Sequence, residues 1–169
     1  MTDNPDGAFE ALHREHYRAV LAYARRRVPA AEADDVVAET FTAAWRNLHR
    51  VPADPLPWLL GVARNVVLHQ RRAHARRDAL SRRLSEQFVQ IQPNTEPIDH
   101  GVLRALAGLP ELDREILMLV GWDGRSVKEA AQIMSTSHVA ARARLHRARR
   151  RLSSSLGMSA TGYPTKERA

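Results

Sequence analysis

Apolar residues recur at helical spacing along nearly the whole chain, whereas the period-2 alternation of half-buried strands is scarce. In the first half, this pattern predicts three helices, over about residues 7–27, 31–48 and 57–77 or beyond. Pro29 would end the first helix, and the two prolines of the loop at 49–56 forbid one continuous helix across it. The pattern therefore predicts a helical bundle in this half of the chain.

The helical pattern decays after Leu84 into the stretch SEQFVQIQPNTEP, which has two prolines and many amides. Apolar spacing returns at Val102 and continues to Val120, so the stretch before it is predicted to be a linker. The expected fold class is all-α, with two small helical domains joined by a flexible linker. The predicted parts are a first domain at 7–84, the linker at 85–98, a second domain at 99–156 and a disordered tail at 157–169.

Residues 126–152, SVKEAAQIMSTSHVAARARLHRARRRL, have the pattern of a helix-turn-helix. Ser126 and Glu129 have the S-x-x-E spacing of a capping box, which predicts the start of a helix. The tripeptide at 135–137 would end this helix and form the turn. The apolar residues expected in the core are Ala130, Ile133 and Met134 on the first helix, and Ala141, Leu145, Ala148 and Leu152 on the second.

The second helix of this motif is strongly basic, with six arginines and no acid between Arg142 and Arg151. A guanidinium group has a rigid fork of donors and keeps its charge at physiological pH, which suits phosphates and guanine edges. A solvated basic helix on an ordinary bundle is the alternative, but it needs neither a capped helix before it nor a three-residue turn. The predicted outward positions are Val139, Arg142, Ala143, His146, Arg147 and Arg150.

The composition also favours a polyanionic partner, because the formal net charge is +7 and only 2 of the 26 basic residues are lysine. The absence of cysteine excludes disulfides and thiolate metal sites. The polar N-terminus lacks the apolar core of a signal peptide, and no run approaches the roughly 20 apolar residues of a membrane span. We therefore expect a soluble, cytoplasmic protein without membrane insertion.

An acidic face is predicted on the second helix, within the segment DDVVAETFTAAW. Asp34 is expected to cap its start, while Asp35 and Glu39 point to solvent. This segment alone allows a core helix with a solvated acidic face, and it also allows a metal site. Adjacent aspartates point about 100° apart on a helix, and no further ligands have suitable spacing, so no metal is expected.

The third predicted helix, PWLLGVARNVVLHQRRAHARR, combines an apolar side with five arginines. A basic amphipathic helix could lie on an anionic membrane, but the bundle already uses the apolar side of this helix. The arginines, together with Trp58 beside the proline-rich loop, would instead form an edge that holds a nucleic-acid backbone and stacks an unpaired base.

Taken together, these segments resemble the extracytoplasmic-function (group IV) sigma factors of bacterial RNA polymerase. An acidic pair with D-[LV]-V-x-E-[TA]-F-x-x-[AL]-W is similar to residues 34–45, and W-L-x-x-[IV]-A-R-N is similar to 58–65. The stretch LP-x-x-x-R-E-[IV]-L-x-L is similar to 109–119. A [WY]-x-G-x-S turn and the basic [KR]-[SA]-R-L-H-R-A-R-x-R-L are similar to 122–126 and 142–152. The resemblance covers roughly residues 8–156.

The resemblance implies a non-enzymatic initiation factor without a cofactor, which binds core RNA polymerase at its clamp helices and flap region and opens promoter DNA. The implied polymerase-binding residues are Asp34, Asp35, Glu39 and Thr42. The implied minus-ten residues are Asn47, Leu48, His49, Trp58, Arg64, Asn65, His69 and Arg72. The implied minus-thirty-five residues are Ser137, His138, Val139, Arg142, Ala143, His146 and Arg147. An anti-sigma factor as a further partner stays open.

Five positions depart from the usual residues of the family: Ala38, His69, Ser135, Thr136 and Val139. Ser135 replaces the usual glycine of a turn that often needs positive φ, which predicts a slightly strained turn.

Two other functions stay open at this point. A stand-alone helix-turn-helix repressor or activator would leave the acidic helix and the Arg64-Asn65 block without a role. A nucleic-acid-processing enzyme would use Asp34, Asp35 and Glu39, and its activity would depend on a metal.

Overall fold

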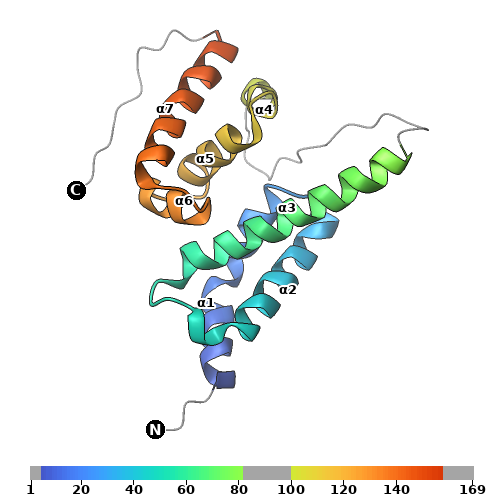
Figure 1. Ribbon diagram of the computed structural model, residues 1–169, viewed down its shortest axis with the longest axis vertical. Helices are drawn as coiled ribbons and strands as arrows, with labels where there is room; N and C mark the ends of the chain where they lie inside the picture. The colour runs from blue at the N-terminus through green and yellow to red at the C-terminus, as the bar shows by residue number, and fades with distance from the viewer. Residues whose placement is uncertain (1–4, 82–99, 158–169) are drawn as a thin grey trace.

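The computed structural model describes residues 5–81 and 100–157, and every regular element within them is a helix (Figure 1). The expected all-α fold is confirmed, while the predicted linker and residues 158–169 of the predicted tail lie outside the described residues. The elements are α1 (Pro5–Arg25), α2 (Ala30–Arg46), the 3-10 turn η1 (Leu48–Arg50), α3 (Pro55–Ser81), α4 (His100–Ala107), α5 (Glu111–Gly121), α6 (Val127–Ile133) and α7 (His138–Ser155).

Helices α1, α2 and α3 form the N-terminal bundle because each carries an apolar stripe at helical spacing. Val20, Val36 and Leu59, one from each helix, are completely buried. Trp45, which the sequence offers for packing, remains 44% exposed, although its ring lies 5.1 Å from that of Phe9 in an edge-on arrangement. This tryptophan therefore lies at the rim of the bundle core.

The helix boundaries in this bundle follow the prolines. Pro29 occupies the N-cap position of α2 and no side chain caps that end, so the expected capping role of Asp34 is wrong. Pro55 begins α3, two residues before the predicted start, because a residue in the first helical turn needs no intrahelical N–H bond. The second helix ends at Arg46 rather than near Leu48, where the chain continues as η1.

Helices α4 to α7 form the C-terminal domain, with α6 and α7 as the helix-turn-helix. The capping box at the start of α6 is confirmed, since the Ser126 hydroxyl accepts from the Glu129 N–H and the Glu129 carboxylate accepts from the Ser126 N–H. Ser135 has a φ of 52°, so the strain predicted for this turn is confirmed. The stripe expected on α7 is buried at Ala141 and Leu145.

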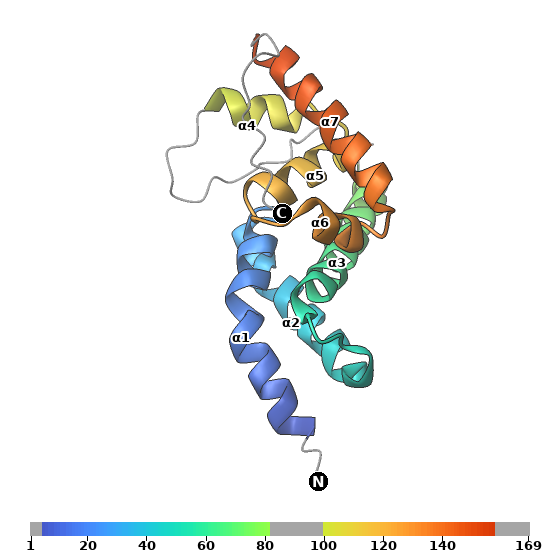
Figure 2. The same cartoon turned by 90° about the vertical axis from the view of Figure 1, so that its left-hand side faces the viewer.

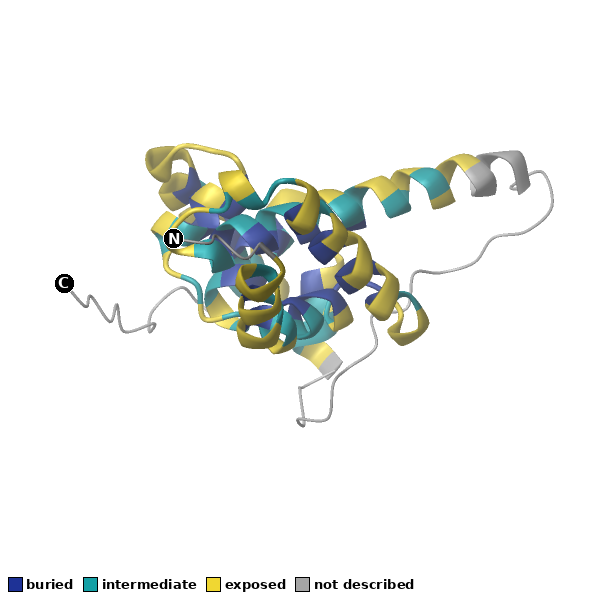
Figure 3. Ribbon diagram, turned by 90° about the horizontal axis from the view of Figure 1, so that it is seen from below, coloured by how far each residue is buried: buried dark blue, intermediate teal, exposed yellow. Residues whose placement is uncertain are grey.

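The two domains pack directly against each other, which the sequence did not predict. Helix α6 lies against α3, and both views of the ribbon place the C-terminal domain beside that helix (Figures 1 and 2). A Cβ atom built on Gly61 would lie 3.7 Å from the carbonyl oxygen of Ile133, so the two backbones approach closely. The buried residues of both domains belong to one apolar cluster, and the buried positions lie where the helices meet (Figure 3).

Candidate nucleic-acid and protein interfaces

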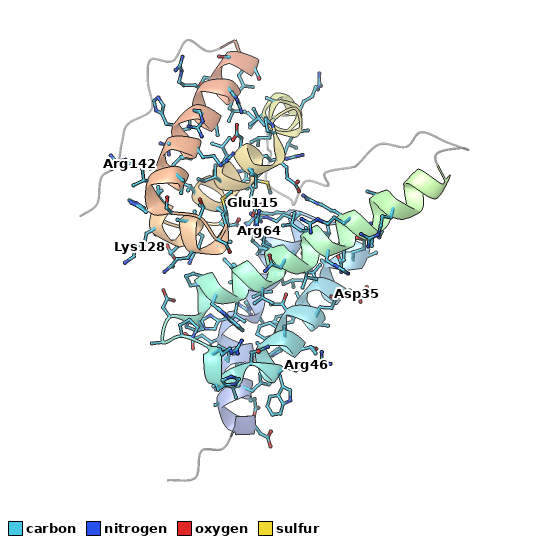
Figure 4. All side chains as sticks on the ribbon, in the orientation of Figure 1. Asp35, Arg46, Arg64, Glu115, Lys128 and Arg142 are labelled. Carbon is cyan, nitrogen blue, oxygen red and sulfur yellow. The ribbon has the colours of Figure 1, made fainter. Side chains whose placement is uncertain are left out.

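The outer face of α7 is the best-formed candidate for contact with DNA. All the residues predicted there are exposed: Ser137, His138, Val139, Arg142, Ala143, His146 and Arg147. Val139 is the most exposed of the large apolar residues, at 77%, and Arg142 extends away from the domain (Figure 4). The first turns of a recognition helix are the part that reaches base edges in a major groove. Ser137 differs from the others because its hydroxyl caps α7, accepting from the Ala140 N–H at 3.1 Å.

The inner side of the same helix is held by one buried acid. Asp113 of α5 is 1% exposed, and its carboxylate accepts from Arg144 at 3.0 Å and from Arg151. These two arginines are seven residues apart, so they lie on one face of α7. Two of the six arginines between 142 and 151 therefore face a carboxylate of their own domain instead of solvent alone.

The acidic stripe of α2 is fully accessible. Asp34, Asp35, Glu39 and Thr42 are all exposed, and the last three recur at i, i+4 and i+7 on one face. The Glu39 carboxylate accepts a bond of 3.3 Å from Gln70 of α3, and the Thr42 hydroxyl donates to the carbonyl of Ala38. This face presents negative charge that no ion pair within the described residues neutralises.

The predicted minus-ten residues of α3 lie on two different sides of the helix. Trp58, Asn65, His69 and Arg72 are spaced by seven, four and three residues, so they share one face, and all but the partly buried Trp58 are exposed. Arg64 shares the side of Gly61 and Arg71, which faces the C-terminal domain. Figure 4 shows Arg64 close to Glu115 at the boundary between the domains. The structure thus separates Arg64 from the other residues predicted to work with it.

The segment between α2 and α3 has a fixed base and an exposed surface. Asn47 closes the end of α2, its side-chain amide donating to the carbonyl of Ala43 at 2.8 Å. Leu48 and Trp58 pack partly against the bundle core, while His49 is exposed. The chain can therefore hold a shaped surface here, because apolar side chains anchor both ends of the turn.

A buried cluster of charges joins the two domains. Arg27, which follows α1, has a side chain that is 2% exposed, and its Nε donates to both carboxylate oxygens of Glu115 at 3.1 and 3.0 Å. Its Nη2 donates to Asp123 at 2.7 Å, and the guanidinium carbon lies 3.5 Å from the centre of the Tyr23 ring. The Tyr23 hydroxyl donates to Glu115 at 2.9 Å. Arg26 adds a second bond of 2.7 Å to Asp123.

The pKa values of this cluster favour the charged acid. Burial alone would raise the pKa of Glu115, but the charge of Arg27 and the bonds from Arg27 and Tyr23 outweigh it and hold that pKa below its ordinary value. Burial is also the largest cause that raises the pKa of the Tyr23 hydroxyl well above its ordinary value, so Tyr23 remains a donor. Glu115 is therefore an ionised carboxylate at neutral pH, bound by donors from the other domain.

Sequence reasoning did not find Asp113, Glu115, Tyr23 or Arg27. One signal was available for Asp113, because this acid is three residues before the buried Ile116 on a helix with an apolar stripe. No comparable signal exists for Arg27 and Glu115, which are 88 residues apart in the chain.

Metal and membrane sites were also searched. Within residues 5–81 and 100–157, no group of three or more His, Cys, Asp or Glu side chains could hold a metal ion. None of the helices described there has the length and apolar content needed to cross a membrane.

Comparisons with known proteins agree with this geometry. The family described as Sigma-70 region 2 matches residues 12–77, and the family described as Sigma-70, region 4 matches residues 100–152. The chain is 31% identical over 164 residues to the RNA polymerase sigma factor NccH of Alcaligenes xylosoxydans xylosoxydans, covering 90% of this chain and 88% of the relative. It is 29% identical over 152 residues to the ECF RNA polymerase sigma factor SigM of Bacillus subtilis (strain 168), covering 87% and 91%.

A solved structure shows the same arrangement of helices. The sigma factor RpoE from Bartonella quintana, in a co-crystal with the anti-sigma factor NepR, matches with a TM-score of 0.71 and 27% identity. The match covers 88% of this chain and 96% of that chain. The chain belongs to the sigma-70 family of RNA polymerase sigma factors, in its extracytoplasmic-function branch, and its function is to direct promoter-specific transcription initiation.

Proposed function

We propose that this sigma factor divides its work among three exposed faces. The acidic stripe of α2 binds core RNA polymerase at the clamp helices of its largest subunit. The segment from Asn47 to Trp58 and the outer face of α3 hold the minus-ten element. The outer face of α7 reads the minus-thirty-five element, and the C-terminal domain also meets the flap region. One observation carries this division: the three faces lie on different helices and differ in charge.

The acidic stripe suits a protein partner better than a nucleic acid, because phosphates repel carboxylates. Asp35 and Glu39 have no cationic side chain paired with them in the described residues, so a basic partner surface would gain both charges. The remaining helices supply positive charge for DNA. Arg72, Arg142 and Arg147 are all exposed.

The proposed partners are therefore core RNA polymerase and promoter DNA. An anti-sigma protein is a further proposed partner, since the neighbour RpoE was solved with the anti-sigma factor NepR. We also propose that the chain acts without catalysis of its own and works in the cytoplasm, where core polymerase and promoters are found.

The experiment that tests this division is a charge reversal on α2. Asp35→Lys together with Glu39→Lys should abolish capture of core polymerase and leave the thermal midpoint nearly unchanged, because exposed substitutions usually alter stability by no more than about 0.5 kcal/mol. Glu10→Lys with Glu15→Lys on α1 is the matched control, since these acids are also exposed. Equal capture of polymerase by both double variants would remove α2 from the polymerase interface.

A further inference from the structure

The contact between the domains has a buried ionic centre, which distinguishes it from a loose contact between neighbours. Arg27 and Glu115 are both at most 8% exposed, and their bonds join opposite sides of the boundary. Around them, Gly61 meets Ile133 and the buried apolar residues of both domains form one cluster. The closed arrangement is therefore held by apolar packing and by an ion pair that water does not screen.

This arrangement conflicts with binding to both promoter elements. Elements centred at minus ten and minus thirty-five are about 25 base pairs apart, which is about 85 Å of duplex at 3.4 Å per pair. Ile133 lies against Gly61, and Arg142 follows nine residues later. Four residues of turn and the start of α7 cover at most about 25 Å. The outer faces of α3 and α7 therefore lie far too close together to reach both elements.

We propose that Tyr23, Arg27, Glu115 and Asp123 form a latch that keeps the free factor closed and must open before both promoter elements can be contacted. The promoter part of this proposal rests on the roles proposed above for α3 and α7. The latch also covers the inner side of α3, where Arg64 lies beside Glu115 (Figure 4). Opening would expose Arg64 and bring it into the basic surface of its own domain.

The chemistry of the latch allows it to open reversibly. A buried ion pair offsets its own desolvation, so its charges lose little when water replaces the partner on both sides at once. Removing only one partner is different, because the remaining charge stays buried and uncompensated in the closed form. The 18 residues between Ser81 and His100 would span about 60 Å when extended, which permits the domains to separate.

The latch can be tested by measuring the distance between the domains in the free chain. The sequence has no cysteine, so Arg18→Cys on α1 and Arg149→Cys on α7 place donor and acceptor dyes at two exposed sites without competition. The labelled parent should show a short distance. Arg27→Gln or Glu115→Gln should shift the ratio of open to closed molecules at least about tenfold toward open.

The control variant is Glu111→Gln, which removes a pair with Arg71 that spans the same boundary but is exposed at both ends. It should shift the ratio less than about twofold, because exposed pairs contribute little. Circular dichroism shows whether each variant keeps its helices. If Glu115→Gln unfolds the C-terminal domain, Tyr23→Phe and Arg27→Gln decide, since both lie in the other domain.

Unchanged short distances in folded Arg27→Gln and Glu115→Gln would overturn the latch, and so would a parent that is already mostly open. These measurements need neither polymerase nor DNA, so their outcome is independent of the proposed residue roles. Transcription is then assayed with core polymerase and a promoter. If the open variants need less core polymerase for half-maximal transcription, closure inhibits the factor. If the distance lengthens but that requirement is unchanged, closure has no inhibitory role and the proposal fails in that part.

Discussion

Replacing Asp113 with alanine is the sharpest test of how α7 is positioned. The Asp113 carboxylate is almost completely buried and accepts from two arginines of α7, whereas Arg144 and Arg151 are about one-third and one-half exposed. After the substitution, both arginines can reach water, so the cost is smaller than for a fully buried pair. We expect the recognition helix to lose its fixed attachment to α5 and two basic side chains to become free.

The magnitude follows from the two bonds. Hydrogen bonds to charged groups contribute about 1.5–3 kcal/mol each, and the exposure of the two arginines reduces this by about half. Asp113→Ala should therefore lower the free energy of unfolding by about 2–3 kcal/mol. In a chain of this size, that corresponds to a fall of roughly 4–12 °C in the thermal midpoint. Thermal and urea denaturation followed by circular dichroism measure both quantities.

DNA binding gives the second readout of this substitution. Two released arginines should raise affinity for DNA of any sequence and steepen its dependence on salt, while affinity for the matched promoter element rises less. Leu112→Ala, at an exposed neighbouring position of α5, is the control and should change neither. A loss of stability below about 0.5 kcal/mol, or an unchanged salt dependence, would refute the positioning role of Asp113.

Four further outcomes are expected. Arg142→Ala or Arg147→Ala should cost about 1–3 kcal/mol of discrimination in footprints of matched against mismatched upstream elements, whereas equal weakening on all sequences would indicate a phosphate contact. Replacing residues 49–53 with Gly and Ser should abolish permanganate reactivity of minus-ten thymines on intact duplex but spare polymerase binding; normal reactivity would exclude the segment from melting. Glu115 has a pKa below its ordinary 4.5, so its stabilising effect is complete above pH 4.5 and is lost as pH falls through the folded value; labelled domains should then separate in acid, and an unchanged distance would contradict this. Gly61→Ala should stabilise α3 by up to about 1 kcal/mol in thermal denaturation, because its Cβ would make an ordinary contact of 3.7 Å, and a destabilised variant would show a tighter boundary.

Local features of this fold were predictable from the sequence. The capping box of α6 depends only on Ser126 and Glu129, and the strained turn depends on one residue, Ser135. Such features are set by neighbours in the chain, so the pattern contains the information. The ends of α2 and the start of α3 were placed less well, because a proline can either stop a helix or begin one, and tertiary packing selects between these outcomes.

The contact between the domains was not predictable in the same way. Its central pair, Arg27 and Glu115, joins residues 88 positions apart, and each looks like an ordinary surface charge in its own helix pattern. Leu60 gave an equally weak signal, since it lies beside Leu59 and either could face the bundle, yet both are buried. The sequence pattern shows which side of a helix is apolar, but it does not show that two domains share that apolar surface.

The availability of arginines for DNA is decided by the acids around them, not by their number. The chain between Arg142 and Arg151 has six arginines, but Asp113 binds two of them on the inner side of α7. In the other domain, Glu115 and Asp123 bind the guanidinium of Arg27 in the same way. Three acids of one short stretch, 113 to 123, thus direct basic side chains inward at two places. Those acids leave the outer face of α7, with Arg142 and Arg147, as the positive surface of this domain, and a change in any one of them would redistribute charge without altering a single arginine.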